Sequence, residues 1–177
     1  MSGHNKWSKI KHKKAATDAQ KSKLFSKHAA LIAIESRNAG GDITSPGLKA
    51  AIERAKKDSM PAQNIERAVK KGTGGDAGAL EQVVYESYGP GGVAMIIEGV
   101  TDNRNRTAAE IKHLLGTYEL SLAAPGAASW AFSKNADMEW EANSKVGLSE
   151  EDAKKLMEIV EAIEEHDDIN DVYTNAE

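Results

Sequence analysis

The first 14 residues carry five lysines, and no acidic residue occurs before Asp18. Lys9, Lys11 and Lys13 alternate, so an extended backbone would place their ammonium groups on one side. Such a row can neutralise the phosphates of a nucleic acid, and Trp7 offers a flat ring on which a base can stack. Because the segment has little apolar surface, we expect an arm that becomes ordered only on a phosphate backbone. The candidate contacts of this arm are Lys6, Trp7, Lys9, Lys11, His12, Lys13 and Lys14.

Two further candidates, Lys23 and Lys27, lie on a helix that the sequence predicts from about Asp18. At about 100° per residue, both lysines fall opposite an arc of apolar residues that includes Leu24. Ile34 projects to the lysine side, which predicts that this helix packs on more than one face. We therefore expect the lysine side of the helix to extend the phosphate-binding surface of the arm.

Arg104 and Arg106 fall in the first turn of a helix predicted to follow Thr101 or Asp102 as its cap. The helix dipole disfavours cations there, whereas the free backbone N–H groups of the turn attract an anion. This placement predicts a second anchor for a phosphate or carboxylate. The alternative is that both arginines pair with nearby acids such as Glu98 or Glu110.

No other pattern indicates catalysis, a metal or a cofactor. The chain has no cysteine, which excludes thiolate chemistry. The run 164–168 contains acids and a histidine, but consecutive residues on a helix point in different directions and cannot surround one ion. The glycines of 72–75 lack the Lys and Ser or Thr that a phosphate-binding loop needs. We expect no enzyme, no small-molecule substrate and, since 93–97 is too short to span a bilayer, no membrane partner.

The elements that carry these residues form two groups of opposite charge. Residues 1–73 hold 16 basic and six acidic residues, a net +10, and residues 74–177 hold seven and 21, a net −14. In the first group, Gly40-Gly41 ends the first helix, Pro46 opens a second and Pro61 a third, which Gly72 stops. The charge split at the glycine-rich 72–75 predicts two domains, 1–73 and 74–177, with the basic one directed at nucleic acid.

The acidic group alternates between strand and helix patterns. Strands are predicted at 82–88 and 93–100, joined by the turn 89–92, and a helix follows to about Thr117. Two short strands at 128–132 and 138–141, a helix at 149–166 and a strand at 171–174 complete the order. The sequence thus predicts an α+β fold: a three-helix unit, then a ferredoxin-like βαββαβ domain with an extra N-terminal hairpin strand.

Long stretches of the chain resemble the YebC family, bacterial proteins usually labelled probable transcriptional regulators. The matching stretches are 3–7, 10–16, 18–19, 60–61, 64–68, 70–75, 85–86, 88–94, 101–107, 172–173 and 175–177. Family members typically carry a further α/β domain between a stretch like 130–132 and the last helix, so this chain resembles a compact variant without that third domain.

The resemblance implies a cytoplasmic, non-enzymatic regulator of gene expression that binds nucleic acid. The family label favours DNA and transcription. The mitochondrial relatives include the translational activator of cytochrome c oxidase, which favours ribosomal RNA and the ribosome instead. A third hypothesis is a protein-interaction module that acts through the acidic domain.

Overall fold

The computed structural model describes residues 17–75 and 78–177. Its first part, the helical unit, consists of α2 (Asp18–Asn38), α3 (Pro46–Lys57) and α4 (Ala62–Thr73). Thr17 caps α2 in a reciprocal arrangement with Gln20, which satisfies two N–H groups at the helix start. Gly40 and Gly41 both have positive φ and end α2 as predicted. The expected three-helix unit is confirmed.

The helices of this unit pack around a small apolar core. Its buried members are Ile32, Leu48, Ala51, Ala55, Met60, Ile65 and Ala68. Helices α2 and α4 approach so closely at Gly72 that a Cβ there would lie 2.3 Å from the carbonyl oxygen of Ala33. Ile34 is only 2% exposed, and α2 also contacts β2 and β6 of the second part. This agrees with the expectation that α2 packs on more than one face.

The second part, the sheet unit, is built on a four-stranded antiparallel sheet of order β3-β1-β2-β6. The strands are β1 (Glu81–Tyr88), β2 (Ala94–Thr101), β3 (Leu122–Ala123) and β6 (Ile169–Thr174). The predicted hairpin joins β1 to β2 through Pro90–Gly92, where Gly91 has a positive φ. Strand β2 is buried along almost its whole length because both faces of the sheet are covered.

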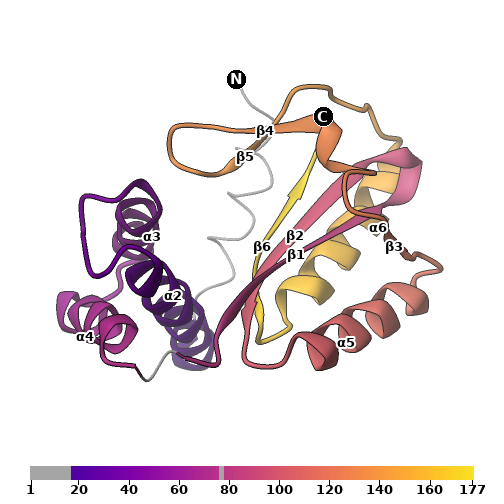
Figure 1. The fold of residues 1–177 in the computed structure, drawn as a ribbon. Helices are drawn as coiled ribbons and strands as arrows, with labels where there is room; N and C mark the ends of the chain where they lie inside the picture. The colour runs from indigo at the N-terminus through magenta and orange to yellow at the C-terminus, as the bar shows by residue number, and fades with distance from the viewer. Residues whose placement is uncertain (1–16, 76–77) are drawn as a thin grey trace.

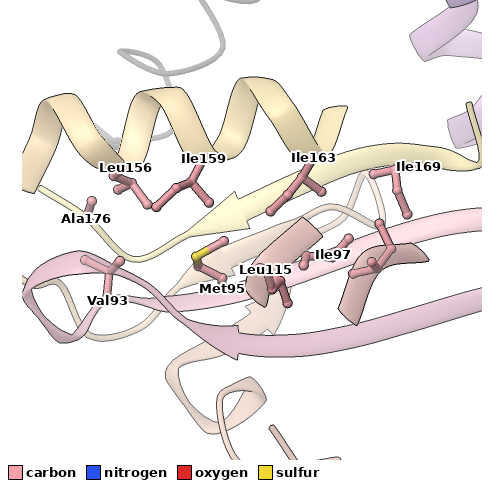
Figure 2. Packing of buried hydrophobic residues seen from close by; sticks show 10 residues of the cluster. Val93, Met95, Ile97, Leu115, Leu156, Ile159, Ile163, Ile169 and Ala176 are labelled. Carbon is pink, nitrogen blue, oxygen red and sulfur yellow. The ribbon is translucent and has the colours of Figure 1, made fainter. Parts of the chain in front are cut away.

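Helices α5 (Arg104–Thr117) and α6 (Glu150–Glu164) cover one face of the sheet (Figure 1). Figure 2 shows Leu156, Ile159 and Ile163 of α6 above Met95 and Ile97 of β2. Several of these side chains are fully buried, and each contributes about 1.5–3 kcal/mol of transfer free energy. This layer holds α5 and the α6–β6 loop in place, so the start of α5 is fixed relative to residues 165–168.

The opposite face is covered by η2 (Ser129–Ala131), β4 (Phe132–Lys134) and β5 (Trp140–Ala142). The α+β class is confirmed, but the strand pairing differs from the expectation. Strands β4 and β5 form a separate two-stranded sheet, while the supposedly extra strand β1 pairs on both sides. Residues 126–129 are not part of the main sheet, and three of their backbone N–H groups donate to the Glu86 carboxylate.

Candidate nucleic-acid interface

The arm residues singled out by the sequence all lie outside the described residues, so their role stays a prediction. They are Lys6, Trp7, Lys9, Lys11, His12, Lys13 and Lys14. The other four candidates, Lys23, Lys27, Arg104 and Arg106, are described. The structure does not bring them to one surface: the lysines lie on α2 and the arginines on the first turn of α5.

Lys23 and Lys27 both reach the C-terminal end of α6. Lys23 Nζ lies 3.4 Å from a carboxylate oxygen of Glu165 and 3.3 Å from one of Asp167. Lys23 and Lys27 also donate hydrogen bonds to the backbone carbonyls of Glu165 and Glu164, respectively. Helix α6 has no basic residue in its own last turn, so α2 supplies the cations that its dipole and free carbonyls favour. Whether these lysines also contact phosphate stays a prediction.

Arg54 of α3 makes a second cationic contact with the sheet unit. Its guanidinium lies 3.6 Å from a carboxylate oxygen of Glu139 and 3.5 Å from one of Asp171, and its side chain is 17% exposed. Burial alone would lower the pKa of Arg54, but the acidic groups of Tyr173, Asp171 and Glu139 raise it above its usual value. Arg54 therefore stays charged and joins α3 to the β4–β5 turn and to β6.

A different set of cations on the helical unit is exposed and has no ion-pair partner among residues 17–75 and 78–177. Lys21 of α2 is one of them, and the others lie on α3 and α4. We call those on α3 and α4 the outer cations; they are Lys49, Lys57, Arg67, Lys70 and Lys71. On α4, the spacing of Arg67, Lys70 and Lys71 places these three on one helix face. Lys56 lies beside the set but pairs with Glu53 at 3.4 Å. The structure thus separates cations that pair with acidic residues of the sheet unit, such as Lys23 and Arg54, from cations on α3 and α4 that have no such pair.

The anion at the start of α5 is a carboxylate of the same chain, that of Asp168. Arg106 Nη2 lies 2.8 Å from an Asp168 carboxylate oxygen and 3.0 Å from one of Asp102, with Glu110 at 3.9 Å from Nε. The hydroxyl of Thr107 donates to Asp168 at 2.7 Å. The cap of α5 is Asn103, whose side chain accepts from Arg106 N, and neither Thr101 nor Asp102 takes that place as the sequence suggested. For Arg106 the pairing alternative is therefore realised, with Glu110 as one of the partners.

The two arginines of this helix turn have different surroundings. Burial alone would raise the pKa of Asp168, but the hydrogen bonds from Arg106 and Thr107 lower it below its usual value. Asp168 is consequently ionised and neutralises Arg106. Arg104 is exposed and makes no ion pair with the part of the chain that the structure describes. It is the arginine of the pair that is free to contact an external anion.

Glu110, His166 and Asp168 offer ligand atoms within 4.8 Å of one another. Helix α6 ends at Glu164, so the expectation that residues 164–168 point apart fails for His166 and Asp168. The Asp168 N–H donates to His166 Nδ1 at 3.1 Å, which leaves Nε2 protonated and directed at Glu110, 2.7 Å away. A metal needs a free lone pair on that nitrogen, and the Arg106 guanidinium already supplies the positive charge. The cluster is a hydrogen-bonded anchor for the α6–β6 loop.

Two features of this surface were not identified from the sequence. From the sequence, the outer cations could not be distinguished from ordinary solvated basic residues. Only the structure shows which basic residues pair with the sheet unit. The loop 124–131, held by the Glu86 carboxylate, had no distinguishing motif. No helix in the described part of the chain is long and apolar enough to cross a membrane.

Comparison with known proteins identifies relatives over nearly the whole chain. A family model described as the TACO1/YebC protein N-terminal domain matches residues 5–75. A model of the TACO1/YebC second and third domain matches residues 80–136 and 133–176. The two models meet where the helical unit gives way to the sheet unit. Whether an inserted third domain is missing from this chain stays a prediction.

Individual relatives agree with these models. A protein of Thermotoga maritima named a probable transcriptional regulatory protein is 52% identical over 141 residues, 78% of this chain and 56% of the relative. One of Dictyoglomus turgidum with the same name is 44% identical over 100% of this chain and 72% of its own length. The chain thus spans about half to three quarters of the length of these curated relatives. The crystal structure of a conserved hypothetical protein from Aquifex aeolicus superposes with a TM-score of 0.79 at 33% identity, over 95% of both chains. This chain belongs to the TACO1/YebC family.

Proposed function

We propose that this chain is a nucleic-acid-binding regulator of gene expression, as the names of its relatives, probable transcriptional regulatory proteins, suggest. The observation that supports the proposal most directly is the set of outer cations. These exposed groups have no acidic partner among the described residues, although the same chain carries 27 acidic residues. Unpaired cations gathered on one unit are the electrostatic requirement for a polyanionic ligand.

In this proposal the outer cations and the arm lysines bind phosphates, with Arg104 as a separate contact on the sheet unit. Each neutralised phosphate lowers the slope of log affinity against log salt by about 0.9 for duplex DNA and about 0.7 for a single strand. If about six phosphates are contacted, the slope for duplex DNA is near −5. Such binding is not specific for a base sequence by itself, because phosphate contacts carry no sequence information.

The test reverses three outer charges in the variant Lys57→Glu, Arg67→Glu, Lys70→Glu. A matched control reverses three exposed lysines of the sheet unit that also lack ion-pair partners among the described residues: Lys112→Glu, Lys145→Glu, Lys154→Glu. Both variants change the net charge equally, so a difference between them reports position and not total charge. Fluorescence anisotropy with labelled duplex DNA and labelled RNA, measured over a salt series, gives affinity and slope.

We expect the slope of log affinity against log salt to be less negative by about two to three in the outer-cation variant and to change little in the control. A further variant with Lys9, Lys11, Lys13 and Lys14 replaced by Glu tests the arm in the same assay. Equal slopes for parent and both of these variants would refute the proposal. Tighter binding to ribosomal RNA than to duplex DNA at equal salt would place the protein in translation rather than transcription. If a variant that binds no nucleic acid still regulates gene expression, the result would favour the protein-interaction alternative.

A further inference from the structure

Trp130 is the most exposed large aromatic side chain in the described part of the molecule. It is 64% exposed, and Tyr88 of β1 beside it is 38% exposed. The indole Nε1 donates to Tyr88 Oη at 3.0 Å, and the Tyr88 hydroxyl in turn donates to the Ala127 carbonyl. These bonds satisfy the polar edge of the indole and fix its orientation. What remains available to a ligand is the apolar ring face.

The backbone that carries Trp130 is held rigidly. The Glu86 carboxylate accepts hydrogen bonds from the N–H groups of Gly126 and Ala128, both at 2.7 Å, and of Ser129 at 2.8 Å. Glu86 is only 8% exposed, so these bonds are shielded from water. A ring presented by a fixed loop loses little conformational entropy when it is covered, which favours binding. Burial of the indole would be the expected arrangement if its only role were to pack.

The loop that carries Trp130 has no acidic residue of its own, although the sheet unit as a whole is acidic. From Leu120 to Ala136 the one charged residue is Lys134, whose ammonium lies 3.2 Å from a carboxylate oxygen of Glu98. The β4–β5 hairpin that follows Trp130 leads to the basic unit, because Arg54 of α3 donates to the carbonyls of Asp137 and Met138 in its turn. The hairpin itself carries Asp137, Glu139 and Glu141, so a phosphate chain would reach the indole over the acid-free loop 120–136 and not along the hairpin.

We propose that Trp130, oriented by Tyr88, is a stacking platform for an unpaired base of a single-stranded nucleic acid. The inference rests on the proposed function and narrows its ligand. Duplex bases are already stacked on both sides, so an indole face can take only a base that is unpaired or at an end. The stacked base adds affinity that salt screens only weakly.

The test compares Trp130→Ala and Trp130→Phe in the full chain. The probe is a labelled single strand of roughly 12 nucleotides, within the range of known site sizes, with the duplex of the same sequence as reference. We expect Trp130→Ala to weaken single-strand binding roughly 5- to 100-fold with an unchanged salt slope, and to affect duplex binding little. Trp130→Phe keeps a stacking face and should stay within about threefold of the parent. Tyr118→Ala removes another exposed aromatic, at 36% exposure, and serves as the matched control.

A second readout covers the case in which Trp130→Ala does not fold. In the variant Trp7→Phe, Trp140→Phe, the remaining Trp130 should be quenched by the single strand and not by the duplex. Unchanged fluorescence at saturating single strand, or equal binding by a folded Trp130→Ala, would overturn the inference. If the parent binds no nucleic acid, the proposed function itself fails. If the parent binds with the expected salt slope, but the Trp130 substitution does not change the affinity and the Trp130 fluorescence does not change on binding, only the stacking platform fails.

Discussion

Replacing Glu86 with Gln tests how the loop 124–131 is held against the sheet. Oε1 of the Glu86 carboxylate accepts from Gly126 N, and Oε2 accepts from Ala128 N and Ser129 N. Glutamine has nearly the same shape but offers one acceptor oxygen and an NH₂ group. If its oxygen keeps the two bonds on one side, its NH₂ group faces the N–H of Gly126. Two donors then oppose each other in a site that is only 8% exposed.

The expected loss of stability follows from these contacts. One buried donor left unsatisfied costs about 1–3 kcal/mol, and the two surviving bonds lose the extra strength that an ionised acceptor gives. We expect Glu86→Gln to lower the free energy of unfolding by about 2–4 kcal/mol. At roughly 2–4 °C per kcal/mol for a chain of this size, Tm should fall by about 4–16 °C. Urea unfolding followed by circular dichroism measures the first quantity and a thermal scan the second.

The same contacts predict a pH dependence. Burial alone would raise the pKa of Glu86, but the three backbone N–H groups lower it below its usual value. A carboxyl with a lowered folded-state pKa stabilises the protein fully above its unfolded pKa, near 4.3, and loses this contribution as pH falls through the folded value. The difference between parent and Glu86→Gln should thus shrink in acid. A difference below about 0.5 kcal/mol at neutral pH, or one that grows toward acid pH, would refute this reasoning. Glu158→Gln, an exposed site on α6, is the control.

Three further variants probe the supports of the proposed surface. Gly72→Ala should destabilise the chain by about 1–3 kcal/mol in urea unfolding, because the new Cβ would lie 2.3 Å from the Ala33 carbonyl oxygen; a neutral result would mean that α2 and α4 can separate. Arg54→Met should remove the guanidinium contacts with Glu139 and Asp171 and speed amide exchange in α3 without changing the salt slope of nucleic-acid binding; unchanged exchange would show that these ion pairs do not hold the units together. Asp168→Asn should weaken the start of α5. Because the pKa of Asp168 is lowered in the folded chain, this effect should be full above the unfolded pKa, near 3.9, and should be lost only as pH falls below that value through the lower folded pKa; an effect that grows toward acid pH would contradict the assigned charge.

Helix ends were predictable because their causes are local. Gly40-Gly41 after α2 and Pro46 at the start of α3 act within a few residues, and the structure has both where the sequence put them. The loop that precedes β4 is held by Glu86, which lies about 40 residues earlier in the sequence. A carboxylate that collects three backbone donors has no sequence motif. The order of elements could therefore be predicted, whereas the sheet to which the short strands belong could not.

The charge pattern predicted which unit is basic but not which cations remain free. Lys23 and Lys27 looked as available as Lys57 or Lys70, yet their ammonium groups contact residues more than 130 positions later in the sequence. For Arg106 the reasoning from the helix dipole was sound, since an anion does lie at the start of α5. Whether that anion comes from a ligand or from Asp168 could not be told from the sequence, because Asp168 lies more than 60 positions after Arg106.

The arrangement of the cations bears on whether the acidic sheet unit blocks a polyanion from reaching the basic unit. The sheet unit contacts α2 and α3 through Lys23, Lys27 and Arg54, while the outer cations make no ion pair with the described residues. The contact also includes bonds that salt does not screen strongly, such as Asn170 Nδ2 to the Lys27 carbonyl at 3.0 Å. Because the sheet unit and the proposed ligand use different cations of the helical unit, we expect a phosphate chain to bind without displacing the acidic residues. Raising the salt concentration should then release the nucleic acid first, while the two units stay together.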